Sequence, residues 1–129
     1  MLKNFFAVLI FIMTILAGVT QVEAADEWVY TYPSGLRVYI VRESVVYGYR
    51  SGFYAKVRVK SANSSGELIR SVMLEFNRDE GDWWYGIEGE RGGRRVYDEE
   101  DATEILRWLQ AHQSEARRTA NPSIRVLGD

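Results

Sequence analysis

The sequence predicts a small α+β domain, an antiparallel β-meander of about six strands with one C-terminal amphipathic helix packed on one face. Three observations lead to this fold class. Apolar and polar residues alternate over short runs from Glu27 onward, which is the period of a half-buried strand. Turn-forming segments separate these runs at the spacing of hairpins. The apolar period then lengthens to that of a helix from Ala102.

The expected strands follow one another closely along the chain. The clearest alternation runs from Phe53 to Lys60, where Tyr54, Lys56 and Arg58 point away from the apolar face. Segments rich in glycine, proline, asparagine or serine predict turns at residues 33–35, 52, 62–66, 79–82 and 89–93. Strands are expected at residues 27–32, 36–41, 45–49, 53–60, 68–76, 83–87 and 94–97.

One amphipathic helix follows the last expected strand. Asp101 and Glu104 have the spacing of a capping box, and the acids at 98–101 and arginines at 117–118 favour the helix dipole. Because one helix covers only part of such a sheet, the second face is either solvated or offered to a partner. The apolar stripe of the helix consists of Ala102, Ile105, Leu106, Leu109, Gln113 and Ala116.

Residues 1–24 have the pattern of a secretory signal peptide. Lys3 precedes the uncharged apolar run Phe5–Val19, and Val22 and Ala24 are small residues at the positions that precede a cut after Ala24. The apolar run is shorter than the about 20 residues of a membrane-spanning helix. This favours cleavage, with retention of the segment as an anchor as the alternative. The mature protein is therefore expected outside the cytoplasm, in the periplasm or at the cell surface.

The rest of the chain divides into two parts. Residues 25–118 are expected to form one small exported domain. Residues 119–129, which contain Asn121 and Pro122, are expected to form a flexible C-terminal tail.

The composition excludes several classes of site and partner. The chain has no cysteine, which excludes disulfides, thiol catalysis and cysteine-ligated zinc. The formal net charge of −2 offers no electrostatic basis for binding nucleic acid. We expect no cofactor, and no stable membrane insertion once the signal peptide is removed.

The adjacent residues Trp83 and Trp84 point to opposite faces of one strand, and Trp83 is assigned to the core with Tyr85 and Ile87. Trp84 then lies on the second face, which aromatic and basic residues share. Such a composition is typical of a recognition surface, although ordinary cross-strand pairing also explains it. The candidate binding residues on this face are Tyr39, Tyr54, Lys56, Arg58 and Trp84.

Three other features have simpler structural explanations than a site. His112 falls at the margin of the helical stripe, where a histidine is usually a boundary packing residue. The glycines between Gly86 and Gly93 fit a hairpin turn, because no helix follows them directly as a phosphate site requires. The acidic segment Asn77–Asp82 lacks the ligand spacing of a calcium loop. We expect neither catalytic nor metal-ligating residues.

The first half of the expected mature domain resembles the surface-adhesin E family of small exported bacterial proteins. The residues that carry the resemblance are Trp28-Val29-Tyr30, Val38-Tyr39-Ile40, Ser44-Val45 and Phe53-Tyr54-Ala55-Lys56-Val57. The resemblance implies an antiparallel sheet with a helix, and adhesion to host matrix proteins.

The sequence therefore favours a non-catalytic exported binding module, adhesin-like, that holds a protein or glycan on its aromatic and basic sheet face. The first alternative is a periplasmic envelope-associated or inhibitor protein that is never exposed at the surface. The second is a small hydrolase built on His112 or an acid with a shifted pKa. The third is self-association, with an exposed edge strand or bare face buried in a two-fold homodimer.

Overall fold

The computed structural model describes residues 21–49 and 52–128. Of the expected signal peptide, residues 21–24 belong to the described part and residues 1–20 lie outside it. The strands are β1 (Glu27–Thr31), β2 (Arg37–Tyr49), β3 (Phe53–Ala62), β4 (Leu68–Asp79), β5 (Asp82–Ile87), β6 (Arg94–Arg95), β7 (Arg117–Arg118) and β8 (Arg125–Val126). The α-helix is α2 (Glu100–His112), flanked by the short 3₁₀ helices η2 (Val96–Asp98) and η3 (Gln113–Glu115).

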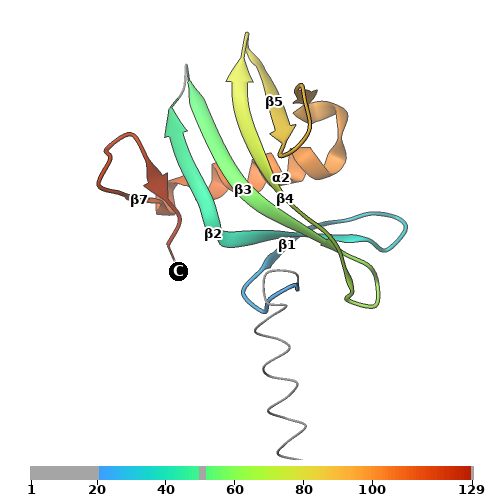
Figure 1. Cartoon of the computed structure of the whole chain (residues 1–129). Helices are drawn as coiled ribbons and strands as arrows, with labels where there is room; N and C mark the ends of the chain where they lie inside the picture. The colour runs from blue at the N-terminus through green and yellow to red at the C-terminus, as the bar shows by residue number, and fades with distance from the viewer. Residues whose placement is uncertain (1–20, 50–51, 129) are drawn as a thin grey trace, which may run out of the picture.

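The strands form one antiparallel sheet in the order β6-β5-β4-β3-β2-β8-β7, and β1 pairs with the first part of β2. Figure 1 shows α2 lying across one face of this sheet, with the β7 hairpin beside β2 at the opposite edge from β5. Within the described residues, the expected antiparallel sheet with one α-helix is confirmed. The sheet has eight strands in the described part of the chain rather than about six.

The core lies between α2 and one face of the sheet. The period-2 alternation is confirmed, because Ala55, Val57 and Val59 of β3 are buried. Each large apolar side chain buried in this way stabilises the fold by about 1.5–3 kcal/mol. Trp83, Tyr85 and Ile87 are buried as expected, and so are the helical residues Ala102, Ile105, Leu106 and Leu109.

Strand β2 joins two segments that the sequence predicts as separate strands. Its pairing with β3 shifts register between Val41 and Val46, and Figure 1 shows the strand turning sharply along its length. The hydroxyl of Ser44 donates to the Val41 carbonyl (2.6 Å) and accepts from the Arg58 backbone N–H (2.8 Å). This side chain supplies ladder partners where the bulge interrupts the strand, so the chain continues as one bent strand.

The start of the helix also differs from the expectation. The N-cap is Glu99, without a side-chain hydrogen bond, and Asp101 already lies inside α2. The Asp101 carboxylate accepts from the Tyr32 hydroxyl instead of completing a capping box with Glu104. The last expected strand is correspondingly short, since Val96 leaves the sheet and begins η2 with its side chain buried.

Residues 125–127 of the expected flexible tail are held in the sheet and the core. Strand β8 pairs with both β2 and β7, and the Leu127 backbone N–H donates to the Val45 carbonyl at 3.1 Å. The Leu127 side chain is 3% exposed and belongs to the core. Burial of this one apolar side chain and completion of the β2 edge hold the segment that follows Pro122 against the domain.

Within the described ranges, neither α2 nor the 3₁₀ helices combine the length and the apolar character that crossing a bilayer requires.

Candidate functional site

The five candidate binding residues lie on the sheet face opposite α2, as their alternation with buried neighbours requires. Asn77 of β4 pairs with Tyr54 on one side and Trp84 on the other, so these two aromatic residues share one cross-strand row. Lys56 and Arg58 follow in the next two rows along β3. Tyr39 lies one row further, opposite Lys60, at the far end of the face.

Both basic candidate residues of this outer face are paired with acids. Lys56 lies 3.6 Å from the Glu75 carboxylate, and Arg58 lies 3.6 Å from that of Glu88. Acids on neighbouring strands therefore offset the charges of Lys56 and Arg58. The alternation of β3 shows where its cations point, but the acids opposite them depend on the register with β4 and β5.

Trp84 also contacts a side chain of a neighbouring strand. The Arg95 guanidinium lies 5.5 Å from the centre of the Trp84 ring and pairs with Asp82 at 3.2 Å. The half-buried indole is thus covered in part by a neighbouring strand's side chain. Three of the five candidate residues, Lys56, Arg58 and Trp84, thus contact side chains of neighbouring segments of the sheet.

A cleft opens on the other face, where the start of α2 stands over one end of the sheet. Its volume is about 510 Å³, within the range of about 300–1,000 Å³ of small-molecule sites. We call it the tyrosine–acid cleft. Its apolar floor consists of Val38, Val59, Val72, Leu74, Tyr85, Ile87 and Ile105. Its polar rim consists of Tyr30, Tyr32, Ser61, Arg70, Arg94, Glu99, Glu100 and Asp101.

Two tyrosines of the rim are bound to two carboxylates at the start of α2. The Tyr30 hydroxyl donates to Glu100, and the Tyr32 hydroxyl donates to Asp101 at 2.5 Å. The hydrogen bond to Glu100 is the main cause that raises the pKa of Tyr30. Burial and then the hydrogen bond to Asp101 raise the pKa of Tyr32. Both phenols therefore stay protonated at neutral pH and act as hydrogen-bond donors.

The charges of the rim are unevenly compensated. Arg94 pairs with Glu90 at 3.1 Å and with Glu99 at 3.5 Å. Among the described residues, Glu100 and Asp101 have tyrosine hydroxyl partners but no ion pair with a cation. Two carboxylates without a counter-ion at the mouth of an apolar cleft favour a cationic group in a ligand.

Sequence reasoning missed this cleft because it assigned the acids at 98–101 to the helix dipole alone. A signal was nevertheless present. Tyr30 and Tyr32 alternate in one expected strand and so share one side of it. Only the packing of β1 beside α2 brings that side of the strand against the acids.

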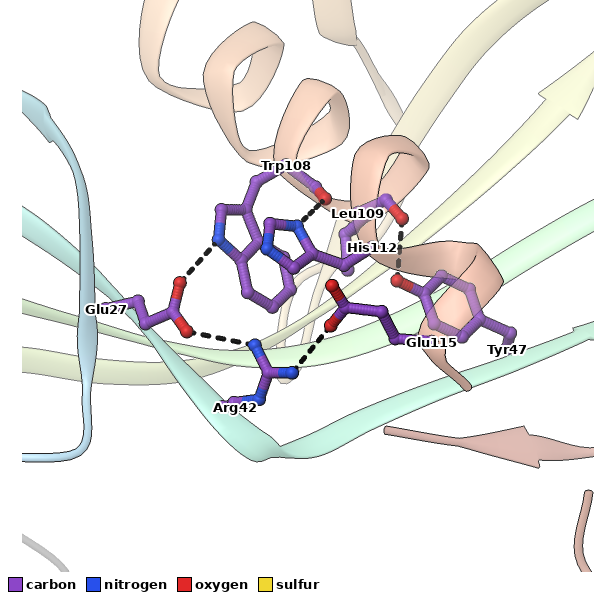
Figure 2. A network of polar contacts seen from close by, with 7 residues as sticks. All are labelled: Glu27, Arg42, Tyr47, Trp108, Leu109, His112 and Glu115. Atoms are coloured by element: carbon purple, nitrogen blue, oxygen red, sulfur yellow. Dashed lines mark hydrogen bonds and ion pairs between the residues drawn. The ribbon is translucent and has the colours of Figure 1, made fainter. Parts of the chain in front are cut away.

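A second polar network lies at the bend of β2 (Figure 2). Arg42 donates to Glu27 of β1 at 3.0 Å and to Glu115 of η3 at 2.7 Å. The indole Nε1 of Trp108 donates to the other oxygen of Glu27 at 2.8 Å. The network ties β1, β2 and the two helical elements together, which is a structural role.

His112 belongs to this region and packs at the boundary of the core. Its ring stacks on Trp108, with ring centres 3.9 Å apart and an angle of 16° between the planes. Its Nδ1 donates to the Trp108 carbonyl oxygen at 2.8 Å (Figure 2). This agrees with the packing role that the helical stripe predicts. In the described part of the chain, no group of His, Asp and Glu side chains is arranged to hold a metal ion.

Comparisons with known proteins do not assign the chain to a family. No family model matches the sequence, no curated protein matches it, and no solved structure matches its fold.

Proposed function

We propose that this protein is a non-catalytic exported binding module that holds a basic segment of a protein partner in the tyrosine–acid cleft. The cleft itself is the observation that supports this most directly. It combines an apolar floor with a few convergent polar groups, which is the usual composition of a ligand site. On the outer face, in contrast, Lys56 and Arg58 are already paired with acids.

The chemistry of the rim suggests the class of ligand. Apolar side chains of a peptide fit the floor between β4 and α2, and a lysine or arginine beside them fits Glu100 and Asp101. A neutral glycan supplies no cation for these carboxylates, so a protein partner is favoured over a glycan. The resemblance to surface-adhesin E proteins supports the same general role, the binding of another protein by an exported domain.

Titration of the protein with two short peptides tests the proposal. We expect the acetylated and amidated tripeptide Leu-Lys-Leu to shift backbone NMR signals of Tyr32, Val72 and Ile87. Its counterpart Leu-Glu-Leu should shift them far less, because its charge repels the rim acids. Shifts centred on Lys56, Arg58 and Trp84 would move the site to the outer face. Equal responses to the two peptides would contradict the assigned ligand class.

A matched pair of variants separates the two faces. The double change Glu100→Gln and Asp101→Asn should weaken binding of the lysine peptide about three- to tenfold, as loss of partly exposed ion pairs predicts. The control Glu75→Gln and Glu88→Gln removes two acids from the outer face and should leave binding unchanged.

The location of the protein distinguishes an adhesin from a periplasmic protein. Protease treatment of intact cells should digest the protein if it is displayed on the surface. Digestion only after permeabilisation of the outer membrane would favour an envelope partner or an enzyme that the protein inhibits.

A further inference from the structure

Asp26 lies immediately before β1 and is one half of a buried ion pair. Its Oδ2 lies 3.0 Å from the Lys60 Nζ, and the two side chains are 0% and 5% exposed. The other carboxylate oxygen, Oδ1, is buried and has no hydrogen-bond partner. A buried carboxylate oxygen without a donor is costly, so this atom lacks a group that would stabilise it.

The contacts around this ion pair come from the residues that end the expected signal peptide. The Glu23 N–H donates to Asp26 Oδ2 at 2.7 Å, and the Asp26 N–H donates to the Glu23 carbonyl at 3.1 Å. Lys60 Nζ also donates to the Gln21 carbonyl. Ala24 and Ala25 are exposed in the turn between Glu23 and Asp26, so a protease can reach the bond that joins them.

Cleavage of that bond changes the chemistry beside Asp26. Water adds across the Ala24–Ala25 amide, Ala24 leaves as a carboxylate, and Ala25 gains an amine that takes up a proton. The departing segment carries away the Glu23 N–H and the Gln21 carbonyl. The new ammonium has three N–H donors and lies one residue from the Oδ1 that lacks one.

We propose that Asp26 binds the amino terminus of the mature protein. In this proposal a signal peptidase cuts after Ala24, and the α-ammonium of Ala25 binds Asp26 Oδ1. This contact fastens the chain at the start of β1, because Glu27 is the first residue of that strand. A cut at another bond, or retention of the segment as an anchor, leaves Asp26 Oδ1 without the ammonium of Ala25 as a partner. This inference is independent of the ligand of the tyrosine–acid cleft.

Charged side chains from several strands lie near Asp26. Lys60 of β3 shares the Asp26 carboxylate. Glu43 and Arg58 line the adjoining cavity of about 760 Å³, together with Ala25. Glu27 next in the chain is engaged by Arg42. The exposed position of Ala25 lets the ammonium keep water on its outer side.

The first experiment determines the mass and amino-terminal sequence of the exported protein. A chain that begins at Ala25 supports the proposal, and any other first residue overturns it.

The second experiment compares two forms of the chain that begins at Ala25, one with a free amine and one acetylated on that amine. Within the described part of the chain, the first residue that packs in or against the core is Val29. Both forms begin before it and therefore keep the whole core. We expect the amine to titrate at least about one pH unit above its ordinary range of 7.7–8.0, by NMR. We expect the acetylated form to melt at least about 4 °C lower near pH 6.5.

The pH dependence follows from the direction of that shift. An amine whose pKa is raised by folding adds stability in full below its unfolded pKa, and this is lost as pH rises through the folded pKa. The difference in Tm between the two forms should therefore disappear above about pH 10. Equal melting temperatures of the two forms at pH 6.5, together with an ordinary amine pKa, would show that Asp26 does not bind the amino terminus.

Two variants locate the contact. Asp26→Asn should abolish both the raised amine pKa and the effect of acetylation, whereas Glu43→Gln, which removes an acid from the adjoining cavity, should preserve them. Asp26→Glu is the second variant in case Asp26→Asn does not fold, and it should reduce the amine pKa shift. An amine pKa that stays raised in Asp26→Asn, or a shift in Asp26→Glu as large as in the original protein, would assign the shift to another group and overturn the proposal.

Discussion

The phenol hydroxyl of Tyr47 in β2 donates to the backbone carbonyl of Leu109 near the end of α2, at 2.6 Å and across 62 positions of sequence. Both residues are buried, so this is a specific polar link between the helix and the sheet inside the core. Burial is the main cause that raises the pKa of Tyr47, which keeps the hydroxyl a donor.

Tyr47→Phe should lower the free energy of unfolding by about 1–3 kcal/mol, because the buried Leu109 carbonyl loses a donor. Urea denaturation followed by circular dichroism measures this change. The matched control is Tyr49→Phe, which removes a hydroxyl from a side chain that is 73% exposed. Equal losses for the two variants would contradict a role for the link.

Ser44→Ala should destabilise the protein by about 1–3 kcal/mol, since the Val41 carbonyl and the Arg58 N–H both lose their partner at the bulge. Hydrogen exchange of the Arg58 amide should also become faster. Ser34→Ala serves as the control, because its hydroxyl makes only a long 3.5 Å contact in an exposed turn. An unchanged Arg58 amide would show that the serine does not support the bend.

Leu127→Ala should lower the free energy of unfolding by about 2–5 kcal/mol, as for other leucines buried in a core. The loss is measured by thermal or urea denaturation. Ile124→Ala removes a 36% exposed side chain three positions earlier and should have a much smaller effect. A negligible cost at Leu127 would restore the interpretation of this segment as a tail outside the domain.

Glu80→Asn should stabilise the protein by about 0.5–1 kcal/mol. Glu80 and Gly81 form the two-residue turn between β4 and β5, with φ values of 51° and 82°. A turn with two positive φ values favours Asn-Gly, because asparagine adopts this backbone conformation more readily than glutamate. Glu80→Gln removes the charge without this conformational advantage and should leave Tm close to that of the original protein.

Glu99→Gln should raise Tm near pH 7 and change it much less near pH 3. Burial first, and the Asp101 carboxylate second, raise the pKa of Glu99. An acid whose pKa is raised by folding binds its proton more tightly in the folded state, so stability falls as pH rises through the unfolded and folded pKa values. Arg94 offsets little of this at 3.5 Å, because the pair is partly exposed and screened.

Melting curves between about pH 3 and pH 8 test the sign of the Glu99 effect. Glu104→Gln is the control, since Glu104 pairs with the exposed Arg107 on the surface of α2. A Tm for Glu99→Gln below that of the original protein at neutral pH would show that the Arg94 pair outweighs the cost of burial.

Part of the candidate site can be predicted from the local alternation of apolar and polar residues. Alternation alone places Tyr54, Lys56 and Trp84 on the face away from the helix, because adjacent side chains of a strand point to opposite faces. It does not reveal that Lys56 meets Glu75, since this depends on the register between two strands. The cleft could not be predicted for the same reason, because it forms only where β1 and the start of α2 lie side by side.

By itself, the sequence determined the antiparallel strands of the sheet, the stripe that buries Ile105 and Leu109, and the assignment of Trp83 rather than Trp84 to the core. These features follow from periods of two and about 3.6 residues, which are local properties of the backbone. Only the tertiary structure decided that Leu127 completes the core, that Tyr32 meets Asp101 and that Asp26 is buried against Lys60. These contacts join residues far apart in the chain, and their partners are selected by packing of the whole domain, which no local period encodes.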